Sequence, residues 1–213
     1  MGFNGRAYFS TSEMFDYTKY FRPNLLGGSM EYDVDLSQAG CNCNAAFYMI
    51  GMPGIGADGL PFESEDGLHY CDAAKVAGNY CPEFDIMEAN TWAYRAVSHA
   101  CSAPTPAGHF DWCDHPGKCA VDVIEDFPQN SIPYGPGSQY DINTNQPFHI
   151  RVDFEEDSDN EFSSYTITLT QDGREVKMVK DNCDQDLSKM TDDMKNGMTM
   201  AMSIWTSTNF DWL

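Results

Sequence analysis

The stretch that decides the fold is CPEFDIMEAN, residues 81–90, which sets three acidic residues among apolar residues that normally face a core. The acids are Glu83, Asp85 and Glu88, and the apolar residues are Phe84, Ile86 and Met87. A solvated acidic run seldom has an apolar residue after each of its first two acids. The pattern predicts a β-strand with one face lined by carboxylates.

Alternation along a strand explains the first two acids but not the third. Successive side chains point to opposite faces, so Glu83 and Asp85 share one face. Glu88 lies five positions after Glu83, and a regular strand would bury it with the apolar set. A β-bulge near Ile86 and Met87 would add one residue and return Glu88 to the carboxylate face. The sequence therefore predicts a bulged strand.

Carboxylates crowded on one face have a chemical use. Like charges at close range push pKa values apart, which yields one ionised and one protonated acid side by side. A retaining glycosidase needs such a pair, about 5–5.5 Å apart, as nucleophile and acid/base. Two alternatives to this interpretation are a solvated acidic strand and a calcium-binding loop.

The composition bounds the class of protein. The 213 residues are 42% hydrophobic and 13% aromatic, enough for one sizeable core, so we expect a single domain over residues 1–213. Twelve basic against 33 acidic residues give a formal net charge of -21, which argues against nucleic acid and anionic membranes and favours a neutral ligand. The sequence contains no run of eighteen apolar residues, so we expect no membrane span. The N-terminus lacks the apolar core of a signal peptide, so a secretion signal is expected to be removed or absent. We expect a monomer.

The eight cysteines point to an oxidising compartment and hence to an extracellular protein. They stand at positions 41, 43, 71, 81, 101, 113, 119 and 183. This scatter contains no paired C-x-x-C zinc pattern, and none of the five histidines has metal-site spacing with a cysteine pair. The sequence predicts disulfides, no metal site and no cofactor.

Alternating or short apolar segments separated by Gly, Pro and Asn predict many strands and little helix. The expected strands cover residues 29–37, 45–52, 148–154, 164–170, 174–179 and 199–205. Gln171-Asp172-Gly173 is a hairpin signal, and residues 186–197 have the mixture of a short helix that stops at Gly197. These elements predict an all-β protein, an antiparallel β-sandwich. Two long loops, 53–70 and 102–119, are flanked or crossed by cysteines, which predicts pinned loops bordering a cleft.

The chain resembles glycoside hydrolase family 7, the cellobiohydrolases and endoglucanases with a β-jelly roll. The family signature Glu-x-Asp-x-x-Glu followed by Ala-Asn stands at residues 83–90. Other segments follow in the family's order, and together they cover most of the chain: DVDLSQAGCNCNAAFYMIGM (33–52), YCD (70–72), YGPGSQYDINTNQPFHIRVDF (134–154) and MSIW (202–205). The separation from Glu88 to His99 also fits the family pattern.

The resemblance implies a role for each matching position. Glu83 would be the nucleophile, Glu88 the acid/base, and Asp85 the neighbour that holds and tunes Glu83. The residues expected along the sugar path are Asn44, Tyr48, Asp72, His99, Trp205 and Trp212, the two tryptophans as stacking platforms. Most tryptophans in a β-sandwich are core residues, however, and His99 could equally be a satisfied loop histidine tied down by the adjacent Cys101.

The resemblance also implies disulfides that join Cys71 to Cys81, Cys101 to Cys113 and Cys119 to Cys183. The usual partner of Cys41 belongs to a C-terminal region of the family that this chain lacks, and Cys43 has no family counterpart. A bridge between these two lies outside normal disulfide geometry, so free thiols or an intermolecular link are both open.

Departures from the family pattern narrow the expected activity. Family members are commonly far longer, and without their N-terminal and tunnel-forming segments we expect an open groove and no processive action. Met87 stands where the family has tryptophan, and no acidic pair follows Trp205.

We therefore expect endo-acting, retaining hydrolysis of β-1,4-glucan (cellulose) or a related neutral β-glucan. The alternatives are a non-hydrolytic glucan-binding protein on the same fold and a β-1,3- or mixed-linkage glucanase. Three mutually repelling carboxylates favour an enzyme.

Overall fold

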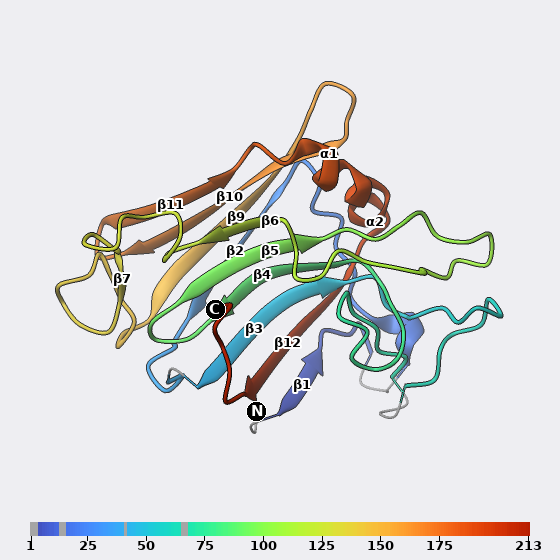
Figure 1. Cartoon of the computed structure of the whole chain (residues 1–213), viewed down its shortest axis with the longest axis horizontal. Helices are drawn as coiled ribbons and strands as arrows, with labels where there is room; N and C mark the ends of the chain where they lie inside the picture. The colour runs from blue at the N-terminus through green and yellow to red at the C-terminus, as the bar shows by residue number, and fades with distance from the viewer. Residues whose placement is uncertain (1–3, 13–15, 41, 65–67) are drawn as a thin grey trace.

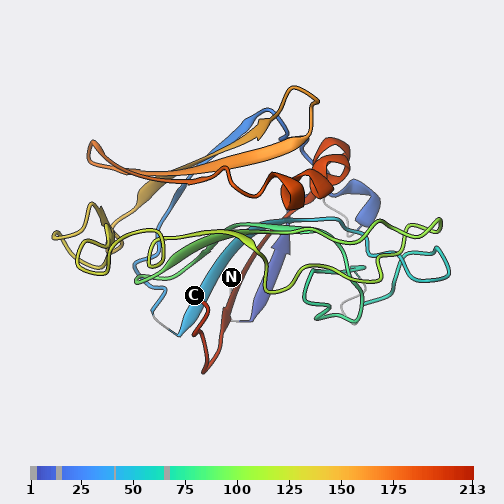
Figure 2. The ribbon, with the colours of Figure 1, turned by 45° about the horizontal axis from the view of Figure 1, so that its top comes forward.

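A computed structural model describes residues 4–12, 16–40, 42–64 and 68–213. Strands dominate this part of the chain and form two stacked antiparallel sheets, with short helices at one end (Figures 1 and 2). The predicted antiparallel β-sandwich is confirmed. None of the described helices has the length and apolar character needed to cross a bilayer.

The larger sheet has six strands. Their spatial order is β1 (Gly5–Tyr8), β12 (Thr199–Thr206), β3 (Cys43–Ile50), β4 (Glu83–Ala89), β5 (Tyr94–His99) and β6 (Cys119–Asp122). The stretch 81–90 therefore supplies a central strand of this sheet. The sequence patterns had not predicted β1, β5 and β6, because these strands are short or lack regular alternation.

The smaller sheet has four strands, in the order β11 (Arg174–Lys180), β10 (Phe162–Gln171), β9 (Phe148–Glu156) and β2 (Ser29–Val34). Asp172 and Gly173 join β10 to β11 with φ angles of 50° and 79°, the positive values of a type I′ turn, which confirms the predicted hairpin. Two short strands, β7 (Tyr134–Gly135) and β8 (Ile142–Asn143), pair in parallel beside the sandwich.

The predicted helical segment is present but broken. It consists of α1 (Asp184–Leu187), a 3-10 turn (Ser188–Met190) and α2 (Thr191–Asn196), and it ends at Gly197 with a φ of 84°. Its apolar residues Leu187, Met190 and Met194 join the main core, so the helices close one end of the space between the sheets. A separate 3-10 turn lies at Tyr17–Lys19.

Aromatic rings join the two sheets behind the central strand β4. Phe84 is fully buried, and its ring meets those of Phe154, Tyr165 and Phe162 at centroid distances of 5.3, 4.9 and 6.0 Å. Edge-on contacts of this kind stabilise a core beyond the burial of apolar area alone. Phe84 thus anchors the apolar face of β4, and the opposite face is left for Glu83 and Asp85.

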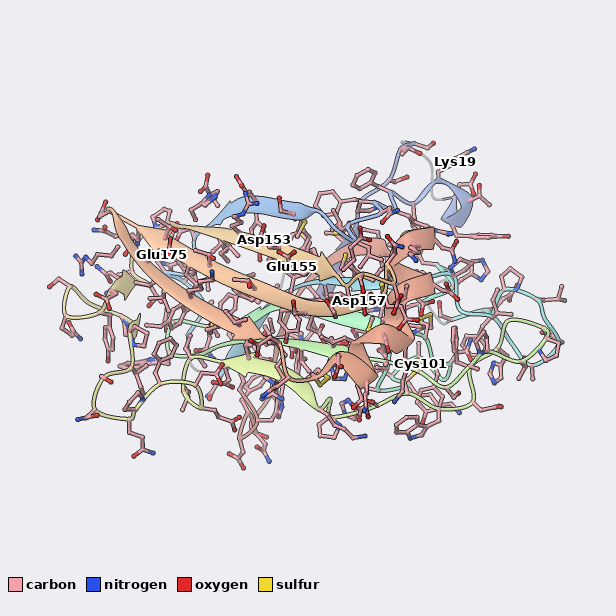
Figure 3. The ribbon with its side chains drawn as sticks, turned by 90° about the horizontal axis from the view of Figure 1, so that it is seen from above. Lys19, Cys101, Asp153, Glu155, Asp157 and Glu175 are labelled. Atoms are coloured by element: carbon pink, nitrogen blue, oxygen red, sulfur yellow. A yellow bond between two sulfur atoms is a disulfide. The ribbon has the colours of Figure 1, made fainter. Side chains whose placement is uncertain are left out.

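The outer face of the smaller sheet is acidic. Asp153, Glu155 and Glu175 point outward there, as Figure 3 shows. On β9 they alternate with Ile150, Val152 and Phe154, which are buried in the core. These three carboxylates therefore lie on a surface away from the larger sheet's open face.

Three disulfides cross-link the described chain: Cys71–Cys81, Cys101–Cys113 and Cys119–Cys183. All three implied pairings are confirmed. Cys43 is a buried thiol packed in the main core, whereas the prediction for Cys41 falls outside the described residues. The first two bridges pin the long loops expected beside the cleft.

We expect Phe84→Ala to lower the free energy of unfolding by about 3–5 kcal/mol, because it leaves a cavity where three rings meet. Val179→Ala on β11, at a site that is 47% exposed, is the matched control and should change stability by about 0.5 kcal/mol or less. Urea unfolding with the disulfides intact measures both. Equal losses in the two variants would contradict this assignment of the core.

Candidate active site

The central strand β4 contains the predicted bulge. In the ladder with β3, Tyr48 lies opposite Asp85. The preceding residue, Phe47, lies opposite Met87, so Ile86 is the extra residue. The ladder with β5 shifts register over the same interval. The bulge predicted from the spacing of the acids is confirmed.

Buried polar contacts hold the bulge in place. The Tyr94 hydroxyl donates to the Ile86 carbonyl oxygen at 2.8 Å, and Tyr94 is fully buried. The carbonyl group of a bulged residue has no ladder partner, and leaving it unpaired in the interior would be costly. The ladder with β3 resumes at Met87, opposite Phe47, and Ala89 further along donates its N–H to the Asn44 side chain, Oδ1, at 3.1 Å. Specific contacts from Tyr94 and Asn44 therefore stabilise the bulge in β4.

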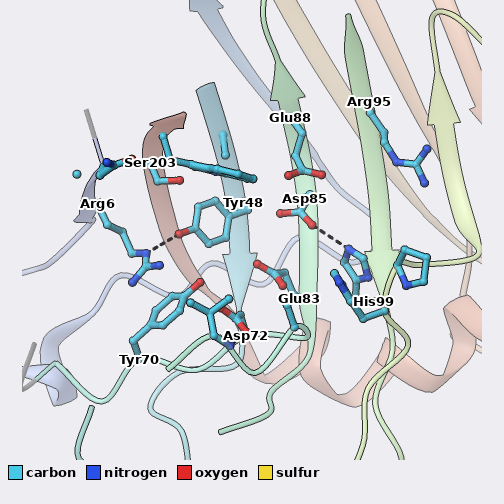
Figure 4. A pocket seen from close by; sticks show the side chains of 18 of the residues that line it. Arg6, Tyr48, Tyr70, Asp72, Glu83, Asp85, Glu88, Arg95, His99 and Ser203 are labelled. Carbon is cyan, nitrogen blue, oxygen red and sulfur yellow. Dashed lines mark hydrogen bonds and ion pairs between the residues drawn. The ribbon is translucent and has the colours of Figure 1, made fainter. Parts of the chain in front are cut away.

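The bulge brings all three acids to one groove. This groove has a volume of about 910 Å³ and crosses the open face of the larger sheet. Glu83, Asp85 and Glu88 line its floor, and Figure 4 shows their carboxyl groups on the same face of β4. The expectation that Glu88 turns away from the core is met.

Glu83 is held by the loop that the first disulfide closes. The Ala73 N–H donates to Glu83 Oε2 at 3.0 Å, and the Cys71–Cys81 bridge fixes the loop that carries it. Burial, followed by the charge of Asp85, raises the pKa of Glu83 well above its ordinary value, and the Ala73 N–H lowers it. Because a backbone N–H can only donate, this contact favours the ionised form of Glu83. Asp72, from the same loop, also lines the groove.

Glu88 has a different environment. The Asn44 side-chain amide donates to Glu88 Oε1 at 2.9 Å. Burial and then the charge of Asp85 raise the pKa of Glu88 to about 8, against the opposing effects of His99, Asn44 and Arg95. A carboxyl group with such a pKa keeps its proton at neutral pH. It is therefore suited to donate a proton.

Asp85 pairs with His99 of the neighbouring strand. His99 Nε2 lies 3.1 Å from Asp85 Oδ2, and His99 Nδ1 lies 2.7 Å from the Asp114 carbonyl oxygen. A carbonyl oxygen only accepts, so Nδ1 carries a proton. A second proton then sits between Nε2 and the carboxyl group, on one or the other. In either arrangement the pair has no net charge, so His99 offsets part of the repulsion between Asp85 and an ionised Glu83.

Close packing fixes the His99 ring. Gly117 has a φ of 87°, and a Cβ atom there would lie 2.4 Å from Val97 Cγ2 and 2.8 Å from His99 Cε1. Only glycine fits this backbone conformation at this distance. The neighbouring His115 ring lies 5.9 Å from that of His99, centroid to centroid. His99 is thus a tightly held residue at the end of β5 that lines the groove, rather than a loop histidine.

The predicted sugar-path residues divide into two groups. Tyr48, Asp72, His99, Trp205 and Trp212 all line the groove. The rings of the two tryptophans are stacked on each other with centroids 6.0 Å apart and an interplanar angle of 22°. Asn44 differs from the expectation, because it is fully buried against the Glu88 carboxyl group and is absent from the lining of the groove.

Sequence reasoning missed several groove residues, namely Arg6, Tyr70, Arg95, His115 and Ser203. Arg6 lies over the Tyr70 ring, 3.3 Å from Cζ to the centroid, and its Nε donates to the Tyr48 hydroxyl at 2.9 Å. Tyr70 belongs to the YCD motif at residues 70–72, so the sequence did indicate that Tyr70 lies near the groove. Arg6 and Arg95 carry no motif, although a lone cation among strand residues of an acidic chain is itself a signal.

One group of potential metal ligands comes together within the described ranges: Cys119, Cys183 and Asp186. The two sulfur atoms form a disulfide, so they offer no thiolate to a metal. We therefore propose no metal site at these three residues.

Comparisons with known proteins agree with the geometry. The sequence profile described as Glycosyl hydrolase family 7 matches residues 63–186, more than half of the chain. Endoglucanase type C of Fusarium oxysporum is 26% identical over 241 residues, which cover 89% of this chain and 54% of that protein. Endoglucanase 1 of Humicola insolens is 26% identical over 250 residues, with coverages of 94% and 61%. The chain therefore spans between half and two thirds of the length of these relatives.

Solved structures share the fold. Endoglucanase I complexed with cellobiose superimposes with a TM-score of 0.74 at 24% identity, covering 92% of this chain and 61% of that one. A cellobiohydrolase from Daphnia pulex superimposes with a TM-score of 0.70 at 22% identity, covering 92% and 61%. With the bulged carboxylate strand and the profile match over residues 63–186, the chain belongs to glycosyl hydrolase family 7.

Proposed function

We propose that the chain is a retaining, endo-acting glycoside hydrolase that cleaves β-1,4-glucan in an open groove. The observation that carries the proposal is the bulge at Ile86, which places Glu83 and Glu88 on one groove floor with different hydrogen-bond partners. Family membership and the endoglucanase names of the relatives support it. A binding protein would have no use for three buried, mutually repelling carboxyl groups.

In the first chemical step, Glu83 acts as the nucleophile. Its carboxylate attacks the anomeric carbon while Glu88 gives its proton to the glycosidic oxygen, so the C–O bond breaks and a neutral alcohol leaves. The product is an ester between the sugar and Glu83. The Ala73 N–H, on one Glu83 oxygen, leaves the other oxygen available for attack.

In the second step Glu88, now ionised, takes a proton from water. The resulting hydroxide attacks the same carbon from the opposite face, which releases Glu83 and retains the original stereochemistry. The proton taken from water stays on Glu88 and Glu83 leaves as a carboxylate, so both groups are back in their starting states. Asp85 and His99 stay together as an uncharged pair beside Glu83 throughout.

The groove suits a neutral sugar chain. Trp205 and Trp212 offer apolar ring faces, on which the C–H face of a glucose unit can stack. Tyr48, Asp72 and Arg6 offer donors and acceptors for hydroxyl groups. We propose action outside the cell, because the three disulfides need an oxidising compartment.

Glu83→Gln should reduce hydrolysis of soluble cellulose at least about a thousandfold, because an amide keeps the shape but cannot act as the nucleophile. Affinity for cello-oligosaccharides should stay within a few fold of the unmodified protein. Reducing-end release measures the first effect, and calorimetric titration measures the second.

The matched control is Glu155→Gln, the same change at an exposed position on the outer sheet, which should leave both quantities unchanged. A panel of β-1,4-, β-1,3- and mixed-linkage glucans tests the linkage in the same assay. Binding of oligosaccharides by the unmodified protein, without reducing ends at any pH from acidic to neutral, would identify a glucan-binding protein instead.

Glu88→Gln should be nearly as damaging for glucans but much less so for an aryl cellobioside, whose activated leaving group needs little protonation. The proton on Glu88 is present below its pKa and lost as pH rises through it. Since that pKa is raised, kcat/KM of the unmodified protein should keep its basic limb in the neutral to weakly alkaline range. Equal losses on both kinds of substrate would remove Glu88 from the acid role.

A further inference from the structure

Strand β12 presents an aromatic ring to the groove. Ile204 packs against the main core, so Ser203 and Trp205 on either side of it face the groove. Ser203 lies in the same row of the sheet as Glu88, because both are register partners of Ala46 on β3. Strands of a sheet lie about 4.7–4.9 Å apart, so β12 is about 10 Å from β4. The Trp205 ring is therefore within reach of the same sugar chain that Glu88 contacts in the proposed mechanism.

A second tryptophan of the same chain already lies on this ring. After β12 the chain turns back and runs alongside β3, as Figures 1 and 2 show. It brings Trp212 onto Trp205, with ring centroids 6.0 Å apart and an interplanar angle of 22°. Phe210 completes the cluster, 5.0 Å from the Trp205 centroid and 5.7 Å from the Trp212 centroid. Residues 207–213, which we call the strap, thus cover apolar ring surface of Trp205.

The strap is joined to the sheet by ring contacts and not by hydrogen bonds. The Asn209 N–H donates to Ser207 Oγ at 3.1 Å, and the Asp211 N–H donates to Asn209 Oδ1 at 3.0 Å. The Leu213 N–H donates to the Phe210 carbonyl oxygen at 3.0 Å. Within the described part of the chain these are the hydrogen bonds of the strap, and none of them reaches another element. The rings can therefore separate without breaking a strand ladder.

We propose that Trp212 covers the sugar-stacking face of Trp205 in the free protein, and that a glucan chain binds there by displacing the strap. The inference rests on the proposed binding of a β-glucan. A glucose unit stacks through its C–H face on an open aromatic face, and Trp212 occupies such a face in this structure. A protein that must first open binds with an affinity reduced by the fraction that is already open. Because an aromatic pair shifts an equilibrium by about two- to tenfold, the strap should weaken glucan binding by about that factor.

The test compares Trp212→Ala with Trp205→Ala in a Glu83→Gln parent, which lacks the nucleophile. Calorimetric titration with cellotetraose should give a Kd about two- to tenfold lower in Trp212→Ala, because the face of Trp205 is open from the start. Trp205→Ala should bind more weakly than the parent, since the stacking platform itself is gone. Trp212→Phe, which keeps a smaller ring, should lie between the parent and Trp212→Ala.

The matched control is Trp92→Ala. Trp92 is 52% exposed, lies between β4 and β5, and does not belong to the lining of the groove. Its removal should leave the Kd for cellotetraose as it is in the parent. The control therefore separates an effect of the strap from a general effect of removing an exposed indole.

A spectroscopic measurement follows the stacked rings directly. Two indoles in contact couple their electronic transitions, which gives a paired positive and negative band in the far-ultraviolet circular dichroism spectrum. This pair of bands should disappear in Trp212→Ala and in Trp205→Ala and persist in Trp92→Ala. In the Glu83→Gln parent it should fade as cellotetraose saturates the groove, because the sugar takes the place of Trp212.

Weaker binding of cellotetraose by Trp212→Ala would show that Trp212 is itself a sugar platform, and it would overturn the proposal. An unchanged Kd, an absence of binding in both proteins, or paired bands that persist at saturation would do the same. The proposed hydrolysis fails separately, when the unmodified protein binds cellotetraose and releases no reducing ends. That outcome leaves the effect of Trp212→Ala on binding unaffected.

Discussion

The extra residue in β4 is the constraint on which the rest of the site depends. Without Ile86 as a bulge, Glu88 would turn toward the rings around Phe84, and burying an unpaired carboxylate there would cost several kcal/mol. The Tyr94 hydroxyl satisfies the freed Ile86 carbonyl from the core side. On the groove side Asn44 bonds both to the backbone after the bulge and to the Glu88 carboxyl. The same residues that stabilise the irregularity therefore aim the carboxyl group.

Proton balance is the second constraint, because three buried carboxyl groups cannot all be ionised at close range. The orientation of His99 resolves much of this conflict. Its Nδ1 proton is committed to the Asp114 carbonyl, so Asp85 and Nε2 share one further proton and form a neutral pair. Glu83 receives a backbone N–H that favours its carboxylate, whereas Glu88 retains its proton. A retaining mechanism starts from one ionised and one protonated glutamate, and the Ala73 N–H makes Glu83 the one whose carboxylate is stabilised by a backbone donor.

The sequence alone predicts those parts of this arrangement that depend on residues close together in the chain. The odd spacing of Glu83 and Glu88 required a bulge, Asp172-Gly173 required a tight turn, and Gly197 ended the helical segment. The contacts between strands were not predictable in the same way. Nothing near Arg95 in the sequence shows that it lies opposite Glu88, because the register between β4 and β5 depends on the bulge itself. The family resemblance implied that Asn44 lines the sugar path, and neither that resemblance nor alternation reveals that Asn44 is fully buried against Glu88.

The distribution of charge over the chain gives the groups buried beside the carboxylates their importance. A formal net charge of -21 makes it harder to ionise any further carboxyl group, and it disfavours anionic ligands at long range. Salt screens exposed charges over about 8–10 Å, which weakens the influence of the acidic outer sheet on the groove. Charges buried beside the carboxyl groups are screened much less. The ionisation of Glu83 and Glu88 is therefore governed by burial first and then by close neighbours, above all Asp85 on β4, so the groove can keep its own proton balance within a strongly acidic protein.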